Sequence, residues 1–406
     1  QLDNDNTTAG RHSGPLTRGS LYPLALAGFD LSTWMAGAVL GDEEVLTAFE
    51  LAGFLQENAL KGRDKLTLFL PREWQGGAIW TKQDFEESLG KSRKIGIKVA
   101  IGEQIKALNY FSPKEMAQDR CFLVINVRSL NNPDATKVSL LRRAGYPLAV
   151  LRLHGDSTLA RYMQFIHYTV FGLAYLRQMN FVTQPNVELY KTIARKIYTQ
   201  AKKVGGTVRT KAWHTAVDNP FSVRWRGGLT VHLGALQRIG DVSEKELGLE
   251  NGNAAAIYAA ALSVLAAKRK ISYGEITFFG DTRYSASGKA ILRILNQAAE
   301  GIFRSRLKMP ADVYEGPAMN HSYHEMIIGY GSGFSTVLLS EKVASLKRVD
   351  YPADYHLAQW LATQEALARR KRAVVGITIR DLSDRSRQTV KEFFAEVGRR
   401  VGHRRS

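Results

Sequence analysis

The chain is poor in the features that mark specialised classes of protein. It contains one cysteine, Cys121, so no internal disulfide can form. We therefore expect a cytoplasmic protein, and we expect Cys121 to be buried in a strand. It has no repeat of fixed period and no low-complexity segment. Its most apolar long stretch, residues 21–40, is interrupted by Asp30, Ser32 and Thr33. These polar residues favour a buried pair of helices over a membrane span.

Acidic residues are also few compared with basic ones. The sequence has 56 lysines and arginines against 38 aspartates and glutamates, a formal net charge of +18. Such a surface attracts anions. Basic clusters occur at 369–372 and 399–406, but no aromatic residues alternate with them as they would on a platform that stacks nucleic-acid bases. We expect solvated helix faces and no specific nucleic-acid partner, with nucleic-acid binding kept as an alternative.

The length and the hydrophobic pattern indicate more than one α/β domain. A chain of 406 residues with 45% hydrophobic content is too long for one ordinary core. Apolar runs alternate with helical stretches, as in proteins with a largely parallel sheet. The expected strands are 65–70, 96–101, 121–127, 149–153, 271–279, 334–340 and 373–379, and the expected helices are 80–89, 158–176, 185–204, 254–269, 287–307, 355–370 and 385–401.

Glycine-rich punctuation predicts where the domains divide. Paired glycines at 205–206 and 227–228 and the sequence Asn-Gly-Asn at 251–253 surround a short expected hairpin, 222–233. We therefore expect a first domain over 1–205, a junction over 206–252 and a smaller α/β domain over 253–406.

Two segments carry the residue types of a proton-transfer enzyme. Residues 85–91, Phe-Glu-Glu-Ser-Leu-Gly-Lys, offer carboxylates beside a glycine-containing turn. Residues 184–191, Gln-Pro-Asn-Val-Glu-Leu-Tyr-Lys, place a glutamine and a lysine at the start of a helix. Moving a proton between neighbouring carbons of a sugar needs a base, donors for the oxygens and backbone groups that approach the substrate.

Together with Gly-Arg-His-Ser at 10–13, these segments resemble the phosphoglucose isomerase family, in particular its second sugar-isomerase domain. The branch fused behind a transaldolase is the most similar. The resemblance implies a three-layer sandwich with a mainly parallel sheet, followed by a second, smaller α/β domain. Residues 321–322 and the helix 355–370 look like the tail of that branch.

The resemblance also implies roles for individual residues. Glu87 matches the proton-shuttling glutamate of the family's Glu-Ser-X-Gly-Lys turn, in which Ser88 and Gly90 would adjoin the substrate. Arg11 matches the arginine that stabilises the enediolate. The remaining matches are Gln184, near the substrate phosphate, and Lys191, which assists ring opening.

In the tail, His321 would line the substrate site. His321 and His324 also have a spacing that could bind a metal on a helix, but no third ligand is evident, and we expect no metal. Taken singly, Glu87 could be a solvated carboxylate at a helix end and Lys191 a surface lysine. The matched spacing favours the functional interpretation of both.

Two departures from the family pattern stand out. The family's first sugar-isomerase domain, whose loop grips the phosphate, is absent before Gln1, so we expect the back half of a longer protein with weak phosphate affinity of its own. The family's ring-opening histidine has no match at its motif position. His154 and His167 flank that region.

The implied activity is the interconversion of glucose 6-phosphate and fructose 6-phosphate through a cis-enediolate, a step of glycolysis and gluconeogenesis. This chemistry needs no metal or redox cofactor. The implied partner is a phosphorylated sugar, with no membrane and with a homodimer left open. The main alternative is a non-catalytic sugar-phosphate-binding module, although such a sensor would not need Glu87, Arg11 and Lys191 together. A transaldolase would need an eight-stranded barrel, and no such succession of units occurs.

Overall fold

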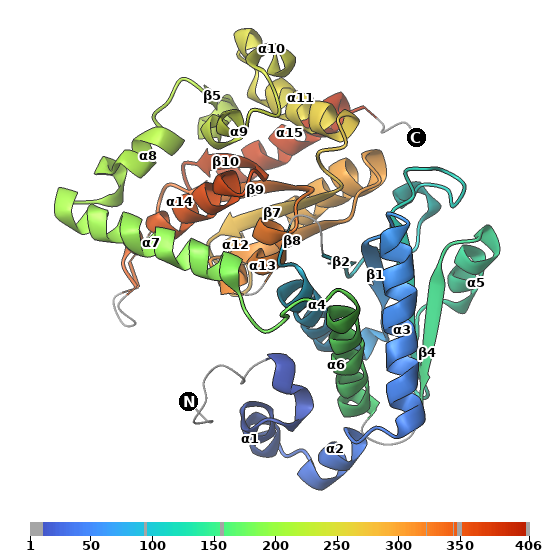
Figure 1. Ribbon diagram of the computed structural model, residues 1–406. Coiled ribbons are helices and arrows are strands. Elements are labelled where there is room, and N and C mark those ends of the chain that lie inside the picture. The colour runs from blue at the N-terminus through green and yellow to red at the C-terminus, as the bar shows by residue number, and fades with distance from the viewer. Residues whose placement is uncertain are drawn as a thin grey trace. The chain divides into compact units, whose positions relative to one another are not determined.

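The structure is a computed structural model that describes residues 11–92, 96–154, 158–321, 323–343, 345–346 and 351–402 (Figure 1). The chain forms two compact units. The first comprises the chain up to Gln184 apart from Leu108–Tyr110, and the second comprises those three residues and Pro185 onward.

The first unit is built on a four-stranded sheet in the order β2-β1-β3-β4, in which each pair of neighbours is parallel. Its strands are β1 (Lys65–Phe69), β2 (Lys98–Ala100), β3 (Arg120–Val127) and β4 (Leu148–Leu153). Its helices are η1 (Arg11–Leu16), α1 (Arg18–Leu26), α2 (Leu31–Gly37), α3 (Asp42–Leu60), η2 (Arg72–Trp74), α4 (Gln75–Leu89), α5 (Ala135–Ala144) and α6 (Thr158–Leu176).

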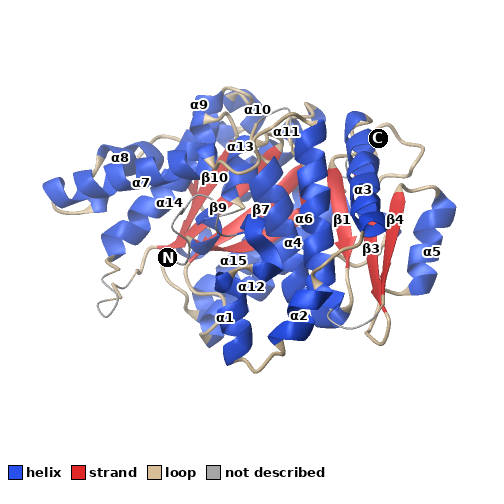
Figure 2. Ribbon diagram, turned by 60° about the horizontal axis from the view of Figure 1, so that its bottom comes forward, coloured by secondary structure: helices blue, strands red, loops and turns tan. Residues whose placement is uncertain are grey.

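The two faces of this sheet carry different sets of apolar side chains. Leu66, Cys121 and Leu123 point from one face into a core shared with α3, α4 and α6. On the other face, the rings of Phe69 and Phe122 stack with centroids 6.2 Å apart. In Figure 2 the strands β1, β3 and β4 lie side by side, with α3 crossing in front of them and α5 beyond β4. The parallel sheet and the helices packed on it confirm the predicted α/β fold.

The buried helix pair predicted for residues 21–40 is only partly correct. Two short helices, α1 and α2, do form there. Trp34 is buried, and its indole nitrogen donates to the Pro15 carbonyl oxygen at 2.9 Å. Leu26, by contrast, is 90% exposed, and Tyr22 and Phe29 are also exposed in the structure. The apolar residues of this stretch are spread around short helices, so only a few of them can face the core.

The second unit contains a six-stranded sheet in the order β5-β6-β10-β9-β7-β8. Its strands are β5 (Ser222–Arg224), β6 (Leu229–His232), β7 (Tyr273–Phe279), β8 (Ala311–Gly316), β9 (Gly333–Ser340) and β10 (Ala373–Ile379). The longer helices are α7 (Pro185–Val204), α11 (Ala254–Ala267), α12 (Ala286–Ala298), α14 (Ala353–Arg369) and α15 (Asp384–Arg400). The shorter ones are η4 (Thr207–Arg209), α8 (Lys211–Ala216), η5 (Arg226–Gly228), α9 (Gly234–Ile239), α10 (Glu244–Leu247), η6 (Leu249–Asn251), η8 (Ala318–His321) and α13 (His324–Gly329), and a π-helix over Ala299–Arg306 continues α12.

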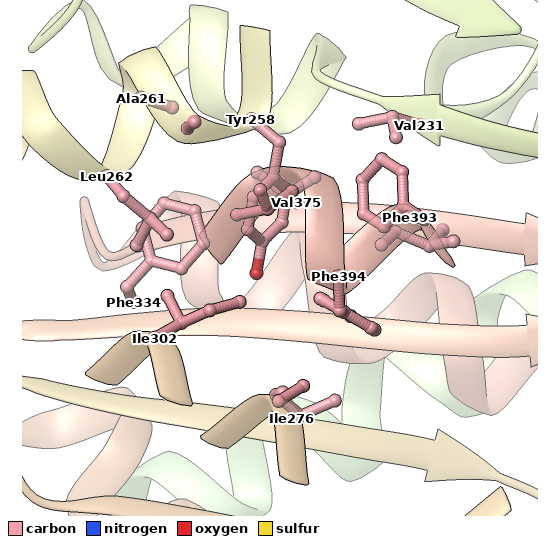
Figure 3. Packing of buried hydrophobic residues seen from close by; sticks show 14 of the residues in the cluster. Val231, Tyr258, Ala261, Leu262, Ile276, Ile302, Phe334, Val375, Phe393 and Phe394 are labelled. Carbon is pink, nitrogen blue, oxygen red and sulfur yellow. The ribbon is translucent and has the colours of Figure 1, made fainter. Parts of the chain in front are cut away.

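Apolar side chains fill both faces of this second sheet. On one face, Tyr258 of α11 points toward the strands with Phe334 and Phe393 on either side (Figure 3). The Tyr258 ring meets Phe334 edge-on at 5.4 Å, and its hydroxyl lies 2.6 Å from Thr336 Oγ1. The hydroxyl therefore has a hydrogen-bond partner in an otherwise apolar core. The opposite face packs against α7, α13 and α14.

The second unit begins earlier than the boundary predicted at residue 205. Helix α7 has the predicted limits, Pro185–Val204, but it packs against α14 and belongs to the second unit. The predicted junction, 206–252, contributes the expected hairpin, because β5 and β6 pair antiparallel as the edge of the six-stranded sheet. The glycines at 205–206 end a helix without ending a domain.

Candidate functional site

Helix α4 carries the glutamate motif at its carboxyl-terminal end. The helix follows Pro71 and a 3-10 turn, and it ends at Leu89, where the Gly90 N–H donates to the Glu86 carbonyl oxygen at 3.1 Å. Its last two turns are buried over 84–89. Neighbouring glutamates on a helix point about 100° apart, so Glu86 and Glu87 must meet different surroundings.

Glu86 belongs to a buried ion cluster in the core of the first unit. Its Oε1 atom lies 2.8 Å from the Lys82 ammonium nitrogen and 2.9 Å from that of Lys98. The same oxygen accepts the backbone N–H of Val99 at 3.0 Å. All three charged side chains are buried. Glu86 therefore ties α4 to strand β2.

Glu87 faces a different set of groups, and it is the residue that matches the family's catalytic base. Its side chain is 4% exposed. The Gln184 side-chain amide donates to Oε1, and the Gln83 amide donates to Oε2 at 3.1 Å. Donors of this kind stabilise the ionised carboxylate. The structure thus brings together two of the predicted site residues, Glu87 and Gln184.

A lysine fixes the turn after α4. The Lys91 ammonium donates to the Glu87 carbonyl oxygen at 2.8 Å and also to the Thr183 carbonyl oxygen. Lys91 and Gln184 together link the end of α4 to the segment before α7. The predicted substrate-binding residues Ser88 and Gly90 lie in this same turn. The Ser88 hydroxyl is buried and directed at Asp84 Oδ1, 3.4 Å away.

The segment that carries Arg11 packs against the same part of the unit. Helix η1 begins at Arg11 and contacts α4 and α6. The Arg11 side chain lies outside the described residues. Within η1, Gly14 has a φ of 50°, and a Cβ placed on it would lie 2.1 Å from Nε2 of His167. Only glycine allows η1 to approach α6 this closely.

His167 and Asp84 form a pair that the sequence patterns do not identify. Nδ1 of His167 lies 3.3 Å from Asp84 Oδ2, and Asp84 is fully buried one turn before Glu87 and Ser88. The Trp80 ring meets His167 edge-on at 5.1 Å. In the sequence, His167 only flanks a motif. The sequence patterns also miss the hydrogen bond from Gln83 to Glu87. Gln83 precedes Glu87 by four residues, and this spacing, which places two side chains on one helix face, could have indicated the contact.

The remaining predicted site residues belong to the second unit. Lys191 lies on α7, and its ammonium pairs with Glu188 at 2.7 Å. His321 ends η8, and its side chain lies outside the described residues. His154, which also flanks the motif region, belongs to the first unit and is exposed at the end of β4.

His324 is fully buried on α13, and burial lowers its pKa from 6.5 to about 3. The described residues contain no group of three or more His, Cys, Asp or Glu side chains arranged to hold a metal ion. Within the same part of the chain, no helix has the length and apolar character needed to cross a bilayer.

Comparisons with known proteins do not place the chain in a family. No protein-family model and no curated protein matches it. Among solved structures, a hypothetical protein from Thermus thermophilus aligns at 11% identity with a TM-score of 0.28, covering 94% of this chain and 88% of its own. A protein from Salmonella typhimurium, named provisionally as sugar binding, aligns at 10% identity and a TM-score of 0.23 over 83% and 99% of the two chains. Similarities this weak carry no argument about function.

Proposed function

We propose that the chain provides the base-carrying part of a glucose-6-phosphate isomerase that interconverts glucose 6-phosphate and fructose 6-phosphate. The supporting observation is the hydrogen bond from Gln184 to Glu87, because these two residues come from separate motifs of the same resemblance. A chance match of either motif would not bring their side chains together. The parallel sheet beneath α4 is consistent with a sugar-isomerase domain.

In this proposal Glu87 removes a proton from one carbon of the open-chain sugar and returns it to the neighbouring carbon. The amides of Gln83 and Gln184 hold the carboxylate in place. Arg11 would stabilise the oxyanion of the enediolate. Ser88 and Gly90 would adjoin the substrate.

A non-catalytic sugar-phosphate-binding module is the second candidate. One observation favours it: both carboxylate oxygens of Glu87 already accept amide hydrogen bonds, and the side chain is 4% exposed. To act as a base, the Glu87 carboxylate must give up one of these hydrogen bonds before it can accept the substrate proton. The two candidates differ in whether the bound sugar exchanges a proton with solvent, the C1 proton of fructose 6-phosphate or the C2 proton of glucose 6-phosphate.

The test is proton exchange by the natural full-length protein in D2O. With fructose 6-phosphate as substrate, proton NMR measures deuterium incorporation and the formation of glucose 6-phosphate. We expect Glu87→Gln to lower turnover by about 10²–10⁴-fold, the usual contribution of a general base, with little change in KM. The matched control is Glu57→Gln, which alters an exposed glutamate on α3 paired with Lys61. Sugar-phosphate binding without exchange in the wild type would favour the binding module.

A further inference from the structure

A cavity lies at the carboxyl ends of the strands of the first unit. Its volume is about 380 Å³, and it is bounded by three loops, those that follow β1, β2 and β3. Its lining includes Phe69, Arg72, Trp74, Gln75, Glu103 and Lys137. Glu87 is absent from this lining. It lies twelve residues along α4 from Gln75, about 18 Å at the rise of an α-helix.

The order of the strands explains why a cavity forms there. The chain leaves β1 through α4 toward β2, whereas it leaves β3 through α5 toward β4 on the other side. The two connections diverge from adjacent strands, so the loops after β1 and β3 separate and open a crevice between them. Ligands of open α/β sheets bind in crevices at such switch points.

Two cations from different segments line this crevice. Arg72 comes from the loop after β1, and Lys137 comes from the first turn of α5. Both are exposed. Among the residues that the structure describes, the Arg72 side chain makes no ion pair or hydrogen bond, although its charge acts on the neighbouring Glu73 carboxylate. Lys137 has only a loose ion pair, 4.0 Å from Asp134. Both charges are therefore available to a ligand.

The carboxylates of the cavity are engaged with protein groups. Glu103 is buried and pairs with Arg120 at 3.0 Å. Asp134 caps helix α5, accepting the backbone N–H groups of Thr136 and Lys137 at 2.9 and 3.2 Å. The lining thus presents two cations together with the side-chain amide of Gln75.

The cavity walls are also fixed relative to each other, and its floor is partly apolar. The backbone N–H of Arg72 donates to the Asn131 carbonyl oxygen at 3.0 Å, and this hydrogen bond joins the loops after β1 and β3. Phe69 and Trp74, both buried, form part of the floor. Preorganised walls lower the entropy lost when a ligand binds.

We propose that this cavity binds a phosphate monoester of a small polar molecule, such as a sugar phosphate, at a site separate from Glu87. The dianionic group lies between Arg72 and Lys137, where two charge-assisted hydrogen bonds hold it. The rest of the ligand lies over Phe69 and Trp74, within reach of the Gln75 side-chain amide. The chain thereby has an anion site of its own in the first unit.

The test uses fluorine NMR of the full chain labelled with 5-fluorotryptophan. The Trp74 resonance is assigned from its loss in Trp74→Phe, and glucose 6-phosphate, inorganic phosphate and glucose are titrated at constant ionic strength. We expect saturable shifts of the Trp74 signal with both phosphates and none with glucose. Arg72→Ala/Lys137→Ala should weaken phosphate binding at least tenfold, or about 1.4 kcal/mol, because both charge-assisted hydrogen bonds are lost.

Two controls separate this site from general charge and from the proposed catalytic site. Lys114→Ala/Arg143→Ala also removes two exposed cations of the first unit, and it should leave the titration unchanged. Glu87→Gln should leave it unchanged as well, whether or not the chain is an isomerase. The proposal is overturned if phosphate produces no saturable shift of the Trp74 signal, or if glucose produces the same shift. It is also overturned if Lys114→Ala/Arg143→Ala weakens phosphate binding as much as Arg72→Ala/Lys137→Ala does, or if Glu87→Gln abolishes phosphate binding.

Discussion

The side-chain amide of Gln184 donates a hydrogen bond to the carboxylate of Glu87, across 97 residues of sequence. This contact joins the end of α4 to the segment just before α7. Lys91 reinforces it by donating to the carbonyl oxygens of Glu87 and Thr183. The orientation of the Glu87 carboxylate therefore depends on a long-range contact within the first unit.

Removing Gln184 should disturb Glu87 without unfolding the unit. We expect Gln184→Ala to reduce stability by about 1 kcal/mol, the net contribution of one hydrogen bond, because Gln83 still holds the other carboxylate oxygen. If Glu87 is the base, turnover should fall about tenfold through loss of orientation. Urea denaturation and steady-state kinetics measure the two effects. An unchanged turnover in a catalytically active protein would show that this contact does not orient the base.

The adjacent glutamates should differ sharply in their response to substitution. Glu86→Gln leaves the buried ammonium groups of Lys82 and Lys98 without their shared carboxylate, and breaking such a pair costs about 3–5 kcal/mol. Glu87→Gln preserves an acceptor for the amides and should cost about 1 kcal/mol or less. Denaturant unfolding of both variants under one set of conditions makes the comparison. Equal losses of stability would contradict the separate environments described for the two residues.

Gly14 should tolerate no side chain. Alanine there would adopt an unfavourable positive φ, and its Cβ would overlap His167 Nε2. We expect Gly14→Ala to destabilise the first unit by about 1–3 kcal/mol. Gly62→Ala is the matched control, because Gly62 has a φ of 80° with no atom near its Cβ position. If the two variants lose the same stability, the close contact with His167 contributes nothing.

Buried histidines, among them His324 and His232, should make the second unit sensitive to acid. Burial lowers the pKa of His324 to about 3 and that of His232 to about 4. In the unfolded chain both protonate near pH 6.5, so below this pH the unfolded state binds protons that the folded state does not. Stability should therefore be complete above pH 6.5. It should fall toward pH 4 by about 1.4 kcal/mol per pH unit for each histidine.

His324→Leu should remove one histidine's share of this slope while keeping a buried apolar side chain of similar size. Denaturant unfolding at pH 7.5, 6.0 and 5.0 provides the comparison. His214→Leu is the control, since His214 is exposed beside Asp218. A pH profile of His324→Leu that parallels the wild type would exclude His324 as a source of acid sensitivity.

Local patterns in the sequence predict a helix or strand well where the residues of that segment determine its structure without help from distant segments. The helix predicted over 158–176 and the helix predicted over 185–204 have those limits in the structure. The strand predicted over 121–127 begins one residue earlier, at Arg120, and Cys121 is buried in it. The sequence does not predict strand β8, because Ala311–Gly316 contains Asp312 and Glu315 and lacks a continuous apolar run.

The candidate site is predictable only in part. The resemblance identifies Glu87 and Gln184, and the structure places them in contact. It could not identify the pairing of His167 with Asp84, since these residues lie far apart in the sequence and belong to no shared motif. The roles of Arg11, Lys191 and His321 stay predictions.

The sequence by itself determined the α/β class, the limits of α6 and α7 and the positions of most strands, because hydrophobic periodicity and glycine punctuation act over neighbouring residues, but it did not predict α3. Only the tertiary structure decided that Glu86 is held by Lys82 and Lys98 while Glu87 meets Gln184. It also decided that α7 belongs to the second unit and that the loops after β1 and β3 enclose a cavity. These features depend on strand order and on contacts between distant segments, which local patterns do not encode.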